Sequence, residues 1–285
     1  MTAPIACLFP GCAELGVPVG APGVRLCRGC GRPLGGARFG PPPGYRVASF
    51  LGSGYFADVF LVRELESGAA GAAKLYADVP AKRRAAACET EALRRLSHPR
   101  LPSLRTTFDE GGWRFVVMEL VEGVNLRQEV EAGGPLPVEP VVRLGVEACQ
   151  LFGYVASLGW TYRDLHPKNV HRQTPKGAML VDLDGARPPG APARPAGRIG
   201  YRAPELDGDR PVTPACDLYS LAGCLYFGLT GQDPPTEPGP LTGLRDRLGS
   251  HAGLADLLDA CRRADPARRP SADALGAALE RESGG

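Results

Sequence analysis

The sequence predicts an α+β fold in which a strand-rich part is followed by a helix-rich part, with a small cysteine-rich module in front. Short apolar runs bounded by turn residues are typical of strands, and they concentrate between residues 45 and 120. After Gly123 the apolar residues recur at helical spacing instead. Strands and helices that are segregated along a chain favour the α+β class. The length of 285 residues leaves room for one large domain and one small module.

In the strand-rich part, two predicted strands flank a glycine-rich turn, and a third contains Lys74. A helix is predicted over residues 81–96 because Ala85, Glu89 and Leu93 fall on one face. The predicted strands cover residues 47–51, 58–62, 72–76 and 114–120. The predicted helices of the second part cover residues 138–158, 217–229 and 253–263.

We expect three segments along the chain. Residues 1–36 form the cysteine-rich module, residues 37–44 a linker, and residues 45–280 the large domain. The linker contains three consecutive prolines followed by Gly44, so it is stiff at the prolines and broken at the glycine.

The composition excludes several kinds of partner and location. A formal net charge of +2 gives no basis for a nucleic acid or a membrane surface as a partner. No apolar run reaches the roughly 18 residues of a membrane-spanning helix, and the first residues lack the basic start of a secretory signal. Five of the nine cysteines are dispersed singles, which argues against a disulfide framework. We therefore expect a protein of the reducing cytoplasm.

The other four cysteines form two pairs in the predicted module, Cys7 with Cys12 and Cys27 with Cys30. The turn at Cys27 and Cys30 is followed by Gly31, which allows two thiolates to face one metal ion. Four thiolates make a closed tetrahedral site of the structural kind, and so short a module needs the metal to fold. Zinc is expected. Iron in a rubredoxin-like site and four free thiols in a disordered tail are the alternatives.

Two further motifs are typical of phosphate binding. The glycines within residues 51–59 lie between two predicted strands, where backbone N–H groups can approach phosphates, although an ordinary glycine hairpin has the same pattern. Lys74 lies on the next predicted strand and Glu89 on the helix that follows. A lysine paired with a helix glutamate is positioned to hold the α- and β-phosphates. We therefore predict an ion pair between Lys74 and Glu89.

A carboxylate and an amide lie five positions apart on one predicted loop, at Asp164 and Asn169. Asp164 is predicted to accept or orient a hydroxyl proton, and Asn169 to ligate Mg²⁺. Asp182, at the end of a predicted strand, supplies a second metal-binding carboxylate. Alone, these last two motifs are also compatible with a polar surface loop, and Lys74 with an exposed strand end, but all four motifs occur in the order that phosphoryl transfer requires.

Over residues 45–280 this order and spacing resemble the protein kinases, and bacterial serine/threonine kinases in particular. The resemblance implies a two-lobed fold with a β-rich N-lobe and a helical C-lobe. It also implies ATP and Mg²⁺ as cofactors, and a protein substrate in which serine or threonine is preferred over tyrosine. The cysteine-rich module resembles the zinc-ribbon-like head of the four-cysteine kinases of some bacteria.

The same resemblance assigns roles to single residues. Met118 is the gatekeeper, Glu119 and Val121 form the hinge that reads adenine, and Asp182 is preferred over Asp184 as the metal ligand because it follows Asn169 at the family spacing. The implied catalytic residues are Asp164, Lys74, Asn169 and Asp182. The implied nucleotide-binding residues are Leu51, Gly52, Ser53, Gly54, Val59, Ala72, Lys74, Glu89, Met118, Glu119 and Val121. Two structural roles are also implied, with Asp217 anchoring the catalytic loop and Glu205 pairing with Arg269.

Several residues depart from the family pattern. His166 stands where a lysine usually steadies the γ-phosphate, Asp184 where a glycine is usual, and His171 where the adenine pocket usually has an apolar floor. These departures keep two alternatives open, a pseudokinase scaffold that binds nucleotide and a small-molecule kinase of the aminoglycoside-phosphotransferase kind.

The segment from Leu183 to Gly200 contains no serine, threonine or tyrosine. We therefore expect no switching by phosphorylation within this segment. Arg198 stands where the family usually has a threonine, and Asp164 and Asp184 are its expected ion-pair partners.

Overall fold

The computed structural model describes residues 42–77, 79–110, 113–188, 191, 197–208 and 212–283, together with four two-residue strands within the first 34 residues. Its contacts divide the chain into two compact units. The N-terminal unit comprises Met1–Arg94 and Pro102–Val121, and the C-terminal unit comprises Arg95–Leu101 and Glu122–Gly285. Among the described residues, no helix combines the length and the apolar character needed to cross a bilayer.

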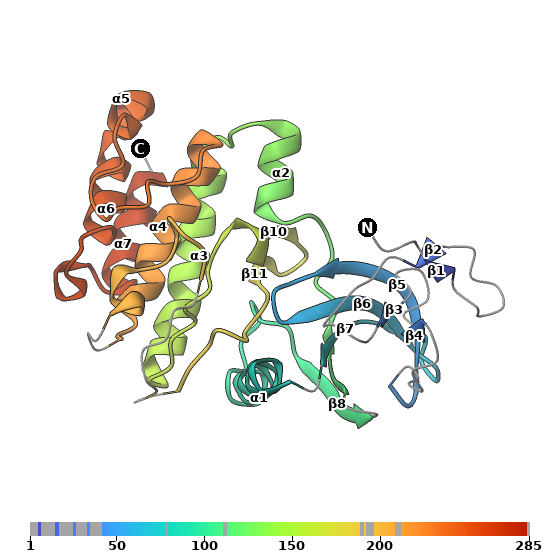
Figure 1. Ribbon diagram of the computed structural model, residues 1–285. Coiled ribbons are helices and arrows are strands. Elements are labelled where there is room, and N and C mark those ends of the chain that lie inside the picture. Colours follow the sequence, from blue (N-terminus) through green and yellow to red (C-terminus); the bar gives the residue numbers. More distant parts are fainter. Residues whose placement is uncertain are drawn as a thin grey trace. The chain divides into compact units, whose positions relative to one another are not determined.

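The N-terminal unit contains a five-stranded antiparallel sheet in the order β5-β6-β7-β9-β8 (Figure 1). Its strands are β5 (Tyr45–Ser53), β6 (Ala57–Glu64), β7 (Ala70–Ala77), β8 (Leu104–Glu110) and β9 (Trp113–Glu119). Phe60, Val62, Leu75, Phe115 and Val117 belong to one buried core cluster, because alternate side chains of a strand share a face. The four predicted strands are confirmed. The edge strand β8 was not predicted, since its threonines and charged residues leave no apolar run.

One helix, α1 (Pro80–Arg95), belongs to this unit and confirms the helix predicted over residues 81–96. Its first residue is Pro80, which suits the first turn because the N–H there has no helical partner. The buried face includes Ala85, Glu89 and Leu93, as the spacing predicts. A charged residue on this buried face requires a partner, and β7 supplies it.

The C-terminal unit is helical and adds one short hairpin (Figure 1). Its helices are α2 (Leu126–Gly133), α3 (Val138–Ser157), α4 (Ala215–Thr230), α5 (Leu244–Leu248), α6 (Ala252–Cys261) and α7 (Ala272–Ser283). The hairpin consists of β10 (Val170–Thr174) and β11 (Gly177–Leu180). Helix α4 is buried along almost its whole length because α3 and α6 both pack on it. The three predicted helices are confirmed, whereas α2, α5, α7 and the hairpin were not predicted because their apolar stretches are short.

In the first 34 residues, β1 (Ile5–Ala6) pairs with β2 (Leu15–Gly16), and β3 (Arg25–Leu26) pairs with β4 (Pro33–Leu34). Both pairs are antiparallel. The four cysteines predicted to bind zinc lie outside the described residues.

Candidate active site

The loop predicted to be catalytic (residues 162–169, hereafter the catalytic loop) is held by Asp217, a buried residue in the first turn of α4. Its two carboxylate oxygens accept hydrogen bonds from the backbone N–H of Tyr162 at 2.8 Å and of Arg163 at 2.7 Å. Arg163 has a φ of 69°, a left-handed conformation that a non-glycine residue keeps only when its surroundings hold it. Burial raises the pKa of Asp217 to about 6, against the opposing effect of these hydrogen bonds. The predicted anchoring of the loop by Asp217 is confirmed.

Asp164 and Asn169 are joined by a hydrogen bond across the loop. The amide Nδ2 of Asn169 donates to the backbone carbonyl of Asp164 at 2.9 Å, which leaves the amide oxygen as the acceptor end of this side chain. The backbone N–H of Val181 donates to the carbonyl of Asn169 at 3.0 Å and ties the loop to the chain that follows β11. The loop therefore presents one carboxylate and one amide oxygen from a fixed backbone.

Three carboxylates gather at this point, from Asp164, Asp182 and Asp184, each offering an oxygen within 4.8 Å of the others. Asp182 has a φ of 69°, a second left-handed non-glycine residue in the site. A Cβ added to Gly185 would lie 2.9 Å from the Cβ of Asp164, so only glycine allows this close approach. The structure thus brings Asp182 to Asp164 as predicted and adds Asp184 to the same cluster.

His166 is held beside the carboxylate of Asp164. Its Nδ1 accepts the backbone N–H of Lys168 at 3.3 Å and caps the short 3₁₀ turn Pro167–Asn169. Its Nε2 lies 3.8 Å from a carboxylate oxygen of Asp164. Burial, and then the charge of Arg198, lower the pKa of His166 to about 4. The imidazole is therefore neutral at physiological pH.

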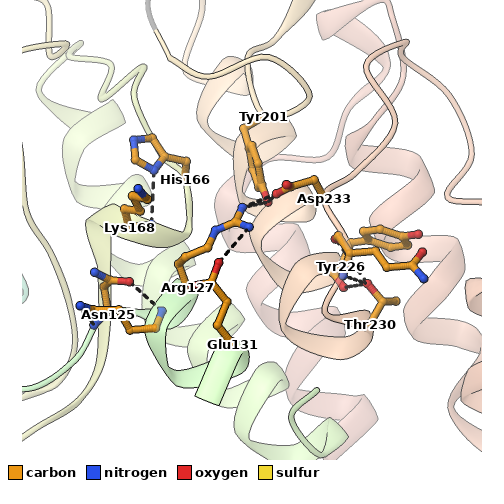
Figure 2. Close-up of polar contacts among 11 residues, drawn as sticks. Asn125, Arg127, Glu131, His166, Lys168, Tyr201, Tyr226, Thr230 and Asp233 are labelled. Carbon is orange, nitrogen blue, oxygen red and sulfur yellow. Dashed lines mark hydrogen bonds and ion pairs between the residues drawn. The ribbon is translucent and has the colours of Figure 1, made fainter. Parts of the chain in front are cut away.

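Next to the catalytic loop, Arg127 of α2 forms an ion pair with Asp233, and the hydroxyl of Tyr201 donates to the same carboxylate at 2.5 Å (Figure 2). The guanidinium of Arg127 also lies 4.2 Å from the ring centroid of Phe227 and 3.6 Å from a carboxylate oxygen of Glu131. Sequence reasoning missed this network. Only the spacing of Arg127 and Glu131 could have suggested part of it, because Asp233 lies 106 positions further on.

Arg198 does not form the expected ion pair. Its side chain is exposed, and within the described residues no hydrogen bond or ion pair joins its guanidinium to Asp164 or Asp184. Asp184 is only 8% exposed, so a guanidinium that reached it would lose most of its hydration. The backbone of Arg198 is nevertheless fixed, since its carbonyl accepts the N–H of Tyr201 at 3.0 Å and of Arg202 at 2.8 Å.

In the N-terminal unit, the predicted ion pair between Lys74 and Glu89 is present, with 2.6 Å between Nζ and Oε1. Lys74 lies on β7 and Glu89 on the buried face of α1. The hydroxyl of Tyr76, two residues along the same strand, donates to the other oxygen of Glu89. The glutamate is therefore oriented from two positions on β7.

The glycine-rich turn connects β5 and β6 in the same unit. Gly52 is paired with Val59 across the turn, and a Cβ added to Gly52 would meet no atom within 4 Å. The hydroxyl of Ser53 donates to the carboxylate of Asp58 at 2.6 Å and holds the two strands together. Leu51 is 50% exposed. The turn is thus an ordered hairpin whose glycine side is open to a ligand.

The predicted hinge residues follow along β9. Met118 is buried and pairs with Ala72 of β7 and with Leu104 of β8. The backbone N–H of Glu119 donates to the carbonyl of Ser103 at 2.8 Å. Val121 lies two residues after β9 ends and is half-buried.

The predicted ion pair between Glu205 and Arg269 is confirmed in the C-terminal unit. It is bidentate, with distances of 2.6 and 2.8 Å, and neither side chain is exposed. Arg269 also donates to the carbonyl groups of Ala215 and Arg263, so its role is to hold the fold.

Comparison with known proteins gives the following matches. The model of the protein kinase domain matches residues 45–278. Calcium/calmodulin-dependent protein kinase type 1B of Rattus norvegicus is 30% identical over 197 residues, which cover 67% of this chain and 57% of that protein. Serine/threonine-protein kinase PkaA of Streptomyces coelicolor is 30% identical over 207 residues, covering 67% of this chain and 38% of that protein. Serine/threonine-protein kinase PknB of Mycobacterium tuberculosis is 27% identical over 239 residues, covering 76% and 38%. The chain thus spans 38 to 57% of the length of these relatives.

Proposed function

This chain belongs to the protein kinase domain family, and we propose that it transfers the γ-phosphoryl group of ATP to a serine or threonine hydroxyl of a protein. The observation that carries the proposal is the carboxylate cluster of Asp164, Asp182 and Asp184 on a catalytic loop anchored by Asp217. The relatives reported above are named as protein kinases, which favours a protein substrate over a small molecule.

In this reaction the substrate oxygen attacks the γ-phosphorus, the bond to the bridging oxygen of ADP breaks, and the hydroxyl proton passes to Asp164. Asp164 is suited to this because the hydrogen bond from Asn169 goes to its backbone and not to its carboxylate. Lys74, oriented by Glu89, would hold the α- and β-phosphates.

Mg²⁺ would be held by Asn169 and Asp182, with Asp184 as a further oxygen ligand. The donor set fits, because magnesium prefers carboxylate and amide oxygens and these residues offer them within a small volume. Bound there, the ion would offset negative charge on the transferring group.

A phosphate-transfer assay with labelled ATP and a mixed protein substrate tests the proposal. Replacing Asp164 by Asn should lower protein labelling by about 10²-fold or more, because the loop loses its proton acceptor. The matched control is Asp246→Asn, which changes an exposed aspartate of α5 and should leave labelling unchanged. Label found only in small molecules would indicate a small-molecule kinase. Nucleotide binding without transfer by the wild type would indicate a pseudokinase scaffold.

We also propose a structural zinc ion bound by Cys7, Cys12, Cys27 and Cys30. In the sequence, the first pair lies between β1 and β2, and the second pair lies between β3 and β4. Cysteine pairs between two antiparallel strands are typical of zinc-binding hairpins, and four thiolates suit zinc. Elemental analysis of protein purified without chelator should give one zinc per chain. Cys27→Ser should lose it, whereas Cys88→Ser should keep it; equal zinc in the two variants, or iron in place of zinc, would contradict the assignment.

We propose, further, that activity does not depend on phosphorylation between residues 183 and 200. This segment offers no hydroxyl acceptor, and the buried Arg163 donates from Nε to the hydroxyl of Thr161 at 2.7 Å. Phosphatase-treated protein, shown by mass spectrometry to be unmodified, should keep full turnover. Turnover that required a phosphate in this segment would overturn the proposal.

A further inference from the structure

The chain just before Arg198 lies directly against the catalytic loop. A Cβ added to Gly197 would lie 3.0 Å from the backbone oxygen of Arg163 and 3.7 Å from a carboxylate oxygen of Asp164. Gly197 has a φ of +87°, which other residues rarely adopt. The backbone that leads into Arg198 therefore passes close to Asp164, at a point where a side chain larger than that of glycine would crowd the loop.

The chain after Arg198 is held by hydrogen bonds. Gly200 has a φ of +86°, and its carbonyl accepts a hydrogen bond from the buried Arg262 at 2.6 Å. Tyr201, whose N–H closes the turn onto Arg198, is held in turn by Asp233 (Figure 2). Arg198 thus projects from a backbone that passes close to the loop at Gly197 and is held by hydrogen bonds at its own carbonyl and at Gly200.

The guanidinium of Arg198 forms no hydrogen bond or ion pair with the part of the chain that the structure describes. Of the described arginines between residues 127 and 202, it alone has no hydrogen bond or ion pair through its guanidinium. Arg127 pairs with Asp233, Arg202 pairs with Asp207, and the others donate to carboxylates, carbonyl groups or hydroxyls. A cation that forms no hydrogen bond or ion pair with the described residues, and that lies near Asp233 only closely enough to lower its pKa, is available to a ligand.

His166 lies beside the carboxylate of Asp164 on the same loop. Because its Nδ1 accepts the N–H of Lys168, its proton resides on Nε2, 3.8 Å from Asp164. The imidazole in this tautomer is a neutral donor. The charge of Arg198 is also close enough to contribute to the lowered pKa of His166, after burial.

We infer that the guanidinium of Arg198 contacts the γ-phosphoryl group during its transfer, which makes Arg198 a catalytic residue. The inference rests on the proposed function. Negative charge is spread over the three equatorial oxygens of the phosphoryl group as it passes from the bridging oxygen of ADP to the substrate oxygen. A guanidinium can bind two of these oxygens at once, and it keeps its charge at every physiological pH.

Lys168 is the competing cation, since it is exposed on the catalytic loop. Two observations favour Arg198. Its neighbour Gly197 passes close to Asp164, and the charge of Arg198 lowers the pKa of His166 more than the charge of Lys168 does. A second competing role is the recognition of acidic side chains in the substrate. That role would change the KM for acidic peptides and would leave the turnover of neutral peptides unaltered.

The test compares Arg198→Ala, Arg198→Lys and Lys168→Ala with the wild type, using one acidic and one neutral peptide. Arg198→Ala should lower kcat by about 10²-fold on both peptides, because a donor to the transition-state charge is lost. Arg198→Lys should recover part of the loss, since it restores the charge without the bidentate geometry. Arg247→Ala, at an exposed position of α5, is the matched control and should behave as the wild type.

A second measurement does not depend on turnover. Aluminium fluoride with ADP mimics the planar phosphoryl group, so Arg198→Ala should weaken binding of this complex about 10²-fold and leave the Kd of ADP alone unchanged. Equal binding of the complex by variant and wild type would overturn the inference. So would a kcat within about threefold of the wild type, a loss confined to the acidic peptide, or a larger loss in Lys168→Ala. Absence of protein labelling by the wild type would instead contradict the proposed function, and the aluminium fluoride measurement would still decide the role of Arg198.

Discussion

Each unit of the molecule contains a buried ion pair, and the two pairs differ in what surrounds them. In the C-terminal unit, Glu205 and Arg269 are both fully buried and bonded at both oxygens, and the guanidinium also lies 4.9 Å from the ring centroid of Tyr219. In the N-terminal unit, the side chain of Lys74 keeps 9% exposure beside the fully buried Glu89.

The chemistry of the two cations matches this difference. Arginine is a planar fork, and in Arg269 the donors are directed to Glu205 and to backbone carbonyl groups. Lysine is a point charge on a flexible stem, and Glu89 holds it by one oxygen while Tyr76 donates to the other. An ion pair that is fully buried stabilises the fold, whereas an ion pair whose cation is partly exposed can also bind a ligand. Two predictions test this contrast directly, and two more concern the loop that contains Asp164.

The largest effect is expected at the enclosed pair. Arg269→Met should lower the free energy of unfolding by about 3–5 kcal/mol, because Glu205 is left buried without a partner. Denaturant unfolding followed by circular dichroism measures the loss. Arg247→Met, at an exposed position, is the control and should change it little. A loss no larger than in the control would remove the structural role assigned to this pair.

Lys74→Met should lower kcat by about 10²- to 10³-fold, because a donor to the phosphates is lost. It should destabilise the protein less than Arg269→Met, since Glu89 keeps the hydrogen bond from Tyr76. Steady-state kinetics and denaturant unfolding on the same sample separate the two effects. If stability fell as far as in Arg269→Met while turnover persisted, the contrast between the pairs would be lost.

Asp217→Asn should destabilise the protein by about 1–3 kcal/mol at pH 7, because an amide cannot accept both backbone N–H groups. Burial raises the pKa of Asp217 to about 6 from 3.8, so the carboxyl binds its proton more tightly in the folded chain. Protonation of Asp217 therefore stabilises the folded chain. This stabilisation is fully present below the pKa that Asp217 has in the unfolded chain, and it is lost as the pH rises through about 6. The difference in the free energy of unfolding between wild type and variant should therefore increase by about 2–3 kcal/mol as the pH falls from 7 to 4. A gap that stays constant with pH would show that Asp217 titrates normally.

The smallest effect is expected for His166→Gln. The pKa of His166 is lowered to about 4, so the imidazole is neutral at every pH above 5 at which activity is measured, and glutamine is also a neutral donor. We expect kcat within about threefold of the wild type and the same shape of the pH profile between about pH 6 and 9. If the kcat of the wild type changed with an apparent pKa near 6.5 and that change were absent in the variant, His166 would be shown to titrate during turnover.

Local pattern and spacing determined much of this molecule. Short apolar runs bounded by turn residues predicted four strands of the sheet, and helical spacing placed Glu89 on the buried face of α1, where Lys74 meets it. The prediction that Asp164 and Asn169 share one loop also followed from their separation of five positions in the sequence. These features depend on neighbours within one or two elements, and such interactions are encoded by residues close together in the chain.

Tertiary packing decided the rest. Asp184 joins Asp164 and Asp182 because Gly185 allows the close approach, and the partners Arg127 and Asp233 are 106 positions apart. Sequence reasoning assigned Arg198 a carboxylate partner that it does not have, because burial of Asp184 makes that partner costly to reach. The neutrality of His166 likewise arises from burial and from a charge brought near by folding. Contacts across the chain and the loss of hydration that accompanies them exist only once the elements have packed, so no local pattern specifies them.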